Sequence, residues 1–286
     1  ALLTLKNSEN PSIPHELYLS ATPIPRSLSL VLYEGLDYTI ISESPKNRKT
    51  INTQMIDHDK RSILHDNISK ILHDKEQVYW VCSCIDYTES SESEYVQGVY
   101  EDLSNRFATT SIGMLHGRVD SKENIKTMKK FVSGEIQILV CTTMIEVGVD
   151  VANATCIVIE DPNRFGLSQL HQLRGRVGRS EKQSYCYLVC KNNLSDHALY
   201  RLKALELNSS GFKIAEEDLK LRGSGDYLGH KQSGANHNFK LATPDDALNN
   251  YDLVRESMNC VDKIDEESKN KLIKRWGKDS AETIQL

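Results

Sequence analysis

Short apolar runs alternate with amphipathic helical patterns through most of the chain, and this alternation restricts it to few folds. Residues 61–74, RSILHDNISKILHD, space their apolar side chains along one helical face, and residues 77–85, QVYWVCSCI, follow as a nearly continuous apolar strand. A further helix is marked by Asp120 as N-cap, Glu123 three residues later and Gly134 just past its end. The pattern predicts an α/β fold, with a doubly wound parallel sheet covered by helices on both faces.

Six segments have the composition of strands in one such sheet, and the character of the chain changes after them. Residues 196–222 have an amphipathic helical pattern, residues 223–243 are rich in glycine, and residues 244–275 return to a polar helical pattern. We therefore predict a mostly helical appendage after the sheet. The opening ALLTLK resembles the last turns of a helix, so we expect the sequence to begin inside an element. The strand candidates are residues 15–26, 77–85, 110–117, 136–143, 155–161 and 184–190.

The overall charge excludes a protein whose whole surface is a cationic binding face for nucleic acid, and it does not distinguish between other classes. With a net charge of -5 over 286 residues, the chain is not a general cationic surface for nucleic acid, so polyanion binding has to arise locally. Its longest apolar runs fall far short of the ~20 residues of a membrane helix, and no secretory signal opens it. Seven scattered cysteines without a Cys-x-x-Cys pair predict reduced core residues, no metal site and a cytoplasmic location.

Such a local basic cluster occurs at residues 171–179, HQLRGRVGR. Here Gln172, Gly175, Arg176 and Arg179 follow the spacing Gln-x-x-Gly-Arg-x-x-Arg, which places the two arginines about one turn apart. Guanidinium groups are always charged and fork-shaped, which suits them to the oxygens of a transferring phosphoryl group. The alternative is a pair of surface arginines at a solvated helix end.

Two further motifs stand at predicted strand ends, where open parallel sheets bind ligands. These are SAT at residues 20–22 and TTMIEVGVDV at residues 142–151. With QLRGRVGR at residues 172–179 they resemble motifs III, V and VI of superfamily 2 helicases. The three motifs in this order make the resemblance specific.

The resemblance extends to one family, the RecG branch-migrating DNA helicases. It is carried by YWVCSCI, HGRVDSKEN, IEVGVDVANA and FGLSQLHQLRGRVGR, and it covers residues 13 to about 257. Residues 211–234, GFKIAEEDLKLRGSGDYLGHKQSG, resemble the translocation motif that RecG shares with the transcription-repair coupling factor. The chain departs from this motif at Ser224, where proline is expected, and at Asp226, where glutamate is usual.

The resemblance implies two RecA-like lobes with ATP and Mg²⁺ between them. The sequence contains no Gly-x-x-x-x-Gly-Lys-Ser/Thr phosphate loop, so we expect only the second lobe here, with ATP and Mg²⁺ held mainly by the first. On this basis residues 1–27 are a remnant of the first lobe, residues 28–193 the helicase C-terminal domain and residues 194–286 the appendage. The first lobe and an N-terminal wedge of the same protein are implied partners, together with branched DNA, and a monomer is expected.

The resemblance also implies roles for individual residues. Arg176 and Arg179 would act as arginine fingers, and Gln172 would help position the nucleotide or couple it to motif III. Three roles have structural alternatives: Asp150 as a turn residue, the two threonines as strand ends, and Arg222 as a helix-terminal charge. The implied sites are Arg176, Arg179 and Gln172 for catalysis; Gly148, Asp150, Glu146 and Gly175 for nucleotide binding; Thr142, Thr143 and Arg118 for DNA; and Arg222, Gln232, Ser20 and Thr22 for translocation coupling.

The function expected from this resemblance is an ATP-dependent double-stranded DNA translocase, or helicase, that remodels replication forks and Holliday junctions. These residues by themselves are expected to lack ATPase activity. One alternative is the corresponding lobe of the transcription-repair coupling factor, and another is a non-catalytic module that binds DNA or a protein partner. The sequence assigns no role to His171 or Arg174.

Overall fold

The computed structural model describes residues 48–83, 89–117, 120–142, 150–222 and 264–276, and four isolated residues at 19, 39, 41 and 253. Six parallel strands form one sheet in the order β1-β6-β5-β2-β4-β3. Every pair of neighbouring strands runs in the same direction, as the alternating sequence pattern predicts. The strands are β1 (Asn52–Asp57), β2 (Gln77–Val81), β3 (Ile112–Leu115), β4 (Ile138–Cys141), β5 (Ala154–Glu160) and β6 (Tyr185–Cys190).

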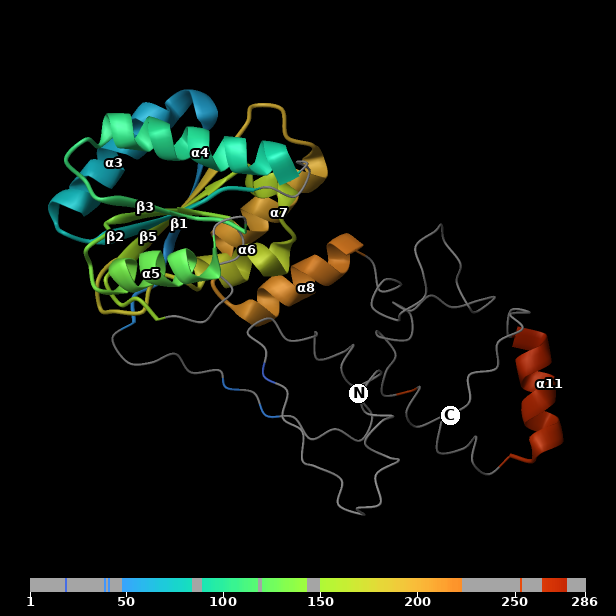
Figure 1. The fold of residues 1–286 in the computed structure, drawn as a ribbon. Coiled ribbons are helices and arrows are strands. Elements are labelled where there is room, and N and C mark those ends of the chain that lie inside the picture. Colours follow the sequence, from blue (N-terminus) through green and yellow to red (C-terminus); the bar gives the residue numbers. More distant parts are fainter. Residues whose placement is uncertain are drawn as a thin grey trace, which may run out of the picture.

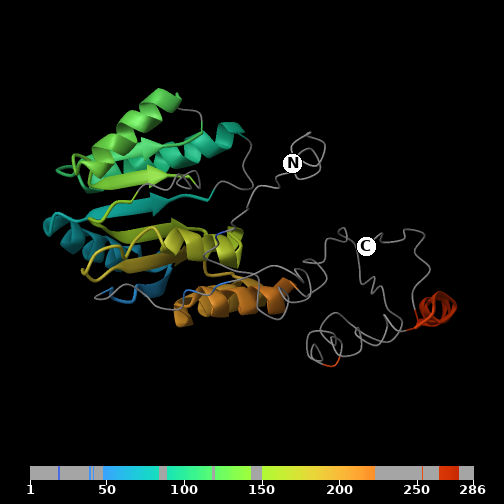
Figure 2. The same cartoon turned by 90° about the horizontal axis from the view of Figure 1, so that it is seen from below.

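Helices cover both faces of this sheet, so the predicted fold class is confirmed (Figure 1). On one face lie α3 (Arg61–His73) and α4 (Glu89–Arg106). On the other face lie α5 (Ser121–Val132), α6 (Leu167–Arg174), α7 (Asp196–Leu207) and α8 (Gly211–Arg222), with α8 beside α6 and α7 (Figure 2). The remaining elements are the 3-10 turns η1 (His58–Lys60) and η3 (Pro162–Arg164), and α11 (Glu266–Trp276).

The hydrophobic core has two halves, because successive side chains of each strand point to opposite faces of the sheet. In β2, Val78 and Trp80 pack against α3 and α4, while Tyr79 and Val81 face the α5 and α6 side. All four side chains are at most 1% exposed, as expected for strands covered on both faces. The helix predicted after Asp120 also forms, because the Asp120 carboxylate accepts a hydrogen bond from the Lys122 N–H.

The helical pattern predicted at 196–222 is confirmed, and it forms two helices, α7 and α8, separated by residues 208–210. The edge strand β1 was not among the expected strands, since NTQMID is largely polar and buries only Thr53 and Ile56. The expected strand at 15–26 lies outside the described residues. The domain boundaries stay predictions, although α7 and α8 share the hydrophobic core of the sheet domain.

β1 owes its place in the sheet to contacts on both sides. It pairs with β6 over its whole length, from Asn52 opposite Tyr185 to Asp57 opposite Cys190. On its outer side the Met55 N–H donates to the Glu206 carboxylate of α7 at 3.2 Å. This bond occupies a backbone donor that an edge strand otherwise presents to solvent or to another chain.

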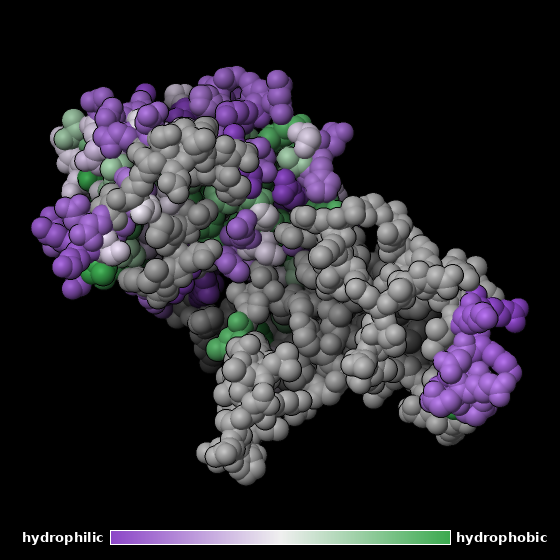
Figure 3. Space-filling model, turned by 45° about the vertical axis from the view of Figure 1, so that its right-hand side comes forward, coloured by the Kyte–Doolittle hydropathy of each residue, from purple (hydrophilic) through white to green (hydrophobic). Residues whose placement is uncertain are grey.

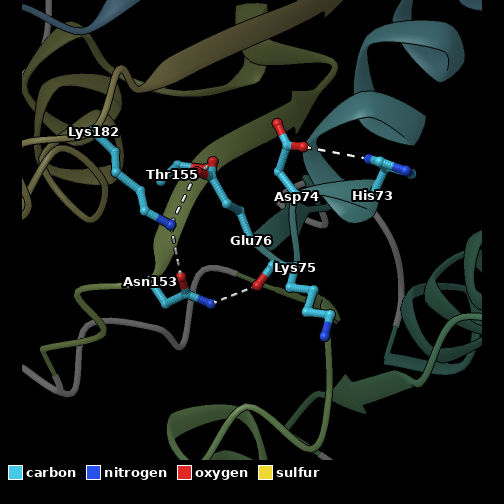
Figure 4. A network of polar contacts seen from close by, with 7 residues as sticks. All are labelled: His73, Asp74, Lys75, Glu76, Asn153, Thr155 and Lys182. Atoms are coloured by element: carbon cyan, nitrogen blue, oxygen red, sulfur yellow. Dashed lines mark hydrogen bonds and ion pairs between the residues drawn. The ribbon is translucent and has the colours of Figure 1, made fainter.

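A polar network fixes the amino edge of the sheet (Figure 4). The Glu76 carboxylate, just before β2, accepts from the Thr155 hydroxyl and pairs with Lys182 at 3.1 Å. Asn153 accepts from Lys182 and donates to the Lys75 carbonyl at 2.9 Å. The network therefore ties together the segments that enter β2, β5 and β6.

One face of the molecule can be compared by hydropathy. Hydrophilic side chains cover most of the described surface on the face drawn in Figure 3. Among the described residues, no helix combines the length and apolar character that a membrane span requires.

Candidate active site

The arginine cluster begins where α6 ends. The backbone continues one turn past Arg174, with the Gly175 N–H bonded to the His171 carbonyl and the Arg176 N–H to the Leu173 carbonyl. Gly175 itself keeps helical angles of φ -67° and ψ -6°. Gly175 is therefore the C-cap of α6, and it does not turn the chain sharply.

The change of direction comes three residues later, at Gly178. Gly178 has a φ of +75°, in the left-handed region that favours glycine. A Cβ atom there would lie 2.9 Å from Cγ1 of Ile51, so a side chain is excluded by space as well as by conformation. Between the two arginines, Val177 is fully buried in the core. Arg176 and Arg179 therefore extend from a loop whose backbone is fixed on both sides of Val177.

Arg179 lies against a second predicted site residue, Asp150. Its Nη1 is 3.4 Å from Oδ1 of Asp150, with the side chains 32% and 66% exposed respectively. The backbone beside Asp150 is also fixed, because Val151 is 3% exposed and its carbonyl accepts from the Ala154 N–H. Motifs V and VI, which are distant in the sequence, thus meet through an accessible ion pair.

Burial raises the pKa of the Tyr79 phenol, whose ring lies 4.8 Å from that of Phe131. Arg176 and Arg179 lower this pKa and Asp150 raises it, so all three charges act on the same point of β2. The three charged groups are thus close enough to the Tyr79 phenol to affect its pKa. Motif V begins at the carboxyl end of β4, as predicted, whereas Asp150 and Arg179 lie farther along, in the segments that lead into β5 and β6.

The segment that leads into α6 is fixed by charged side chains. Asp161 follows β5 with a φ of +45° and lies 3.2 Å from Nζ of Lys191. Arg201 of α7 donates to the Asn163 and Phe165 carbonyls at 3.0 and 3.1 Å. At the start of α6, the Ser168 hydroxyl donates to the Asp218 carboxylate of α8. α6, which leads into the arginine loop (residues 175–179), is thus bonded to α8, and the segment before α6 is bonded to α7.

The structure also assigns a role to Arg174, which the sequence left open. Arg174 is 4% exposed, and its guanidinium donates to the Leu205 carbonyl at 2.6 Å and the Ser209 carbonyl at 3.5 Å. These carbonyls lie at and just after the end of α7, where backbone acceptors lack helical partners and the helix dipole is negative. Arg174 therefore joins α6 to the end of α7. A sequence signal existed: Arg174 stands seven residues after Leu167, on the buried face of α6.

His171 completes this contact in its neutral form. Its Nδ1 lies 3.0 Å from Nη2 of Arg174, and because arginine only donates, Nδ1 must accept. Burial, and then the charge of Arg174, lower the pKa of His171 to about 4. The protonated ring would lose the acceptor and place two positive charges together.

We expect the free energy of unfolding to fall as the pH drops from about 6.5 towards 4. The folded-state pKa of His171 lies below the unfolded value, so the stabilisation is complete above about pH 6.5 and is lost below it. After allowance for partial exposure, the loss is on the order of 1 to 2 kcal/mol. Urea unfolding at pH 7.5, 6 and 5 measures it. In His171→Asn, whose amide oxygen can still accept, the slope should be shallower; an equal slope would contradict the assignment.

A separate charged cluster lies at the carboxyl end of β5. Glu160 is 2% exposed, forms an ion pair with Arg61 at the start of α3, and accepts from Nε1 of Trp80 at 3.0 Å. Burial raises the pKa of Glu160, and the Arg61 charge opposes this rise. No motif singled out Glu160 or Arg61, because each stands alone in the sequence and only the fold brings them together.

The other predicted site residues are distributed as follows. Gln172 is exposed on α6, and Thr142 is 3% exposed at the carboxyl end of β4, where its N–H donates to the Leu115 carbonyl. The burial of Thr142 favours its alternative role as a strand end. Arg222 is the last residue of α8, the position of a helix-terminal charge. Outside the described residues lie Gly148, Glu146, Thr143, Arg118, Gln232, Ser20 and Thr22.

The arginine loop fits a phosphate ligand. Arg179 is partly accessible, its backbone is fixed, and its guanidinium carries five N–H donors. Over the described ranges no cluster of three or more His, Cys, Asp or Glu side chains has the arrangement of a metal site. The described part of the chain can therefore supply positive charge to a nucleotide.

Comparisons with known families agree along the chain. Residues 59–181 match the family "Helicase conserved C-terminal domain". Residues 208–276 match the family "ATP-dependent DNA helicase RecG, domain 3, C-terminal". The first match covers the sheet domain from η1 to the segment before β6, and the second begins just before α8.

Individual relatives and one solved structure extend this similarity. The chain is 40% identical over 267 residues to "ATP-dependent DNA helicase RecG" of Escherichia coli (strain K12), covering 92% of this chain and 38% of that protein. The protein of the same name from Thermotoga maritima is 40% identical over 86% of this chain and 31% of its own length. A chain in "Structure of RecG bound to three-way DNA junction" is 39% identical, with a TM-score of 0.63 over 82% of this chain and 29% of that one. The chain thus spans about a third of the length of these relatives.

Proposed function

The chain belongs to the RecG-type helicases of superfamily 2 and corresponds to their C-terminal part, and from this premise we propose its activity. It forms the second RecA-like lobe and the translocation region of an ATP-dependent DNA helicase that remodels forks and Holliday junctions. The observation that carries this proposal is the arginine loop, where Arg176 and Arg179 flank the buried Val177. The RecG-specific match of residues 208–276 favours this function over the transcription-repair coupling factor.

Within this proposal the chain supplies half of a nucleotide site. ATP supplies the phosphoryl group that is transferred to water. Arg176 and Arg179 bind the oxygens on which charge accumulates, and the fixed loop backbone keeps both guanidinium groups in place. Gln172 orients the nucleotide from the exposed face of α6. We assign ATP and Mg²⁺ mainly to a first lobe, because this sequence contains no phosphate loop.

We propose that α6, α7 and α8 transmit the state of the nucleotide site to duplex DNA. The bonds from Arg174 to the end of α7 and from Ser168 to Asp218 of α8 support this route. Arg222 at the end of α8, with Gln232, Ser20 and Thr22, completes the coupling. If so, Arg222→Ala in the intact helicase retains ATP hydrolysis and loses fork unwinding; loss of both activities together would indicate a folding defect instead.

The partners and location follow from the same proposal. We propose branched DNA as substrate, a monomer as the active form and the cytoplasm as the location. Gly148, Glu146 and Gly175 would complete the nucleotide site, and Thr142, Thr143 and Arg118 the DNA contact. An N-terminal wedge of the same protein would recognise the branch.

A direct test is ATP turnover by the 286 residues alone. We expect no DNA-stimulated hydrolysis above background from this chain, and hydrolysis once it is joined to a first lobe. The control is a matched preparation with Arg176 and Arg179 both replaced by alanine, which should be inactive in either setting. Substantial, arginine-dependent hydrolysis by the chain alone would contradict the division of the site.

A further inference from the structure

Asp150 faces Arg179 from a segment that the core holds in place. Val151, next to Asp150, is 3% exposed, and Val177, two residues before Arg179, is fully buried. Gly178 turns the chain between Val177 and Arg179 with a φ of +75°. The backbone on each side is therefore fixed, and the 3.4 Å contact follows from the fold.

The carboxylate of Asp150 has two possible roles beside a nucleotide. The resemblance to motif V implies a contact with the nucleotide sugar. The geometry points to a different role: we infer that Asp150 is a positioning residue that holds the Arg179 guanidinium in its working orientation. This inference rests on the proposed function, in which Arg179 contacts the transferring phosphoryl group.

The exposure of the pair argues for positioning rather than for stability. With side chains 32% and 66% exposed, the pair contributes little to the folded state, because exposed ion pairs are screened by water. Arginine, however, has a long side chain with many rotamers, and small displacements of a catalytic group have large effects on rate. A carboxylate that limits these rotamers therefore affects turnover far more than folding.

The contact also leaves Arg179 able to bind phosphate. The ion pair with Asp150 involves Nη1 of Arg179, whereas the guanidinium has five N–H donors in all. The charge of Arg176 acts on the same phenol of Tyr79, so two positive groups lie in one region. The negative charge of Asp150 offsets the repulsion between these two guanidinium groups.

The test is a double-mutant cycle between Asp150 and Arg179 in the intact helicase with both lobes, measured as DNA-stimulated ATP turnover. We expect Asp150→Asn to lower kcat by about tenfold and to change KM by less than about twofold. In the Arg179→Ala background, Asp150→Asn should lower kcat by less than about twofold, because a residue that acts through Arg179 has no effect without it. Asp150→Glu should keep most of the activity.

The nucleotide distinguishes the two roles of Asp150. If Asp150 positions Arg179, the loss in Asp150→Asn is the same with ATP as with 2′-deoxy-ATP and 3′-deoxy-ATP. If it contacts the sugar, the loss appears mainly in KM and diminishes with one deoxy analogue. That result, or losses that multiply in the double variant, would overturn the inference.

Controls separate this outcome from failure of the proposed function. Unchanged turnover in Arg179→Ala alone would refute the finger assignment, and the inference with it. A large effect of Arg179→Ala combined with no effect of Asp150→Asn would refute only the inference. Asp57→Asn removes an exposed ion pair with Lys60 and should leave turnover unchanged. Unaltered urea midpoints in all single variants would exclude a folding defect.

Discussion

Arg179→Ala is expected to lower DNA-stimulated ATP turnover of the intact helicase by roughly 10³ to 10⁵-fold, the range of arginine fingers in phosphoryl transfer. The reason is geometric as well as electrostatic. Arg179 extends from a backbone fixed by the buried Val177 and turned by Gly178, so its charge is placed before the reaction begins. The measurement is steady-state ATP hydrolysis with saturating branched DNA.

The same variant should still bind branched DNA, because Arg179 is assigned to the nucleotide and not to the duplex. Arg179→Lys keeps the positive charge but loses the planar, fork-shaped guanidinium group. We therefore expect this variant to recover only a small part of the ATP turnover rate. Gly178→Ala provides a matched probe of the loop, since a methyl group there would lie 2.9 Å from Ile51 and would move Arg179 without changing its charge. Normal turnover in Arg179→Ala would remove the finger assignment.

Glu160→Gln is expected to lower the free energy of unfolding by about 3 to 5 kcal/mol, the cost of removing one partner from a buried ion pair. Glu160 is 2% exposed and the Arg61 side chain is 24% exposed, so the remaining guanidinium recovers only part of its hydration. The amide can still accept from Nε1 of Trp80, which restricts the loss to the ion pair itself. Urea unfolding of the chain at pH 7 measures the change.

The matched control is Asp57→Asn, which removes the ion pair with Lys60. Those side chains are 55% and 65% exposed, so the expected loss is below about 1 kcal/mol. Replacing Glu160 and Arg61 together by methionine should be much less harmful than either single change, because no uncompensated charge is left buried. Equal losses for Glu160→Gln and Asp57→Asn would show that burial of the pair does not determine its contribution.

The elements that sequence predicted well are those with a strong local signal. The apolar runs of β2, β4, β5 and β6 and the cap at Asp120 depend on neighbouring residues, and each was found near its observed place. β1 was missed because its signal is not local. Its polar residues form a strand only because β6 supplies hydrogen bonds and α7 covers the outer edge.

In the candidate site, too, local sequence motifs predicted some features, and others depend on tertiary contacts. The arginines and Asp150 were found as motif positions, but their ion pair depends on how the segments before β5 and β6 are brought together. Arg174 and Glu160 are buried residues whose contacts the sequence did not predict. An arginine or a glutamate in isolation is normally a surface residue, and only tertiary contacts with the end of α7 or with Arg61 make it buried.

The cover on β1 has a consequence for self-association. Glu206 of α7 occupies the outward Met55 N–H, so this edge of the sheet is closed while α7 stays in place. If α7 and α8 move during each ATP cycle, a displacement large enough to break this bond would expose a strand template to another copy of the chain. Variants that loosen α7 from β1 are therefore expected to form aggregates before they lose the sheet.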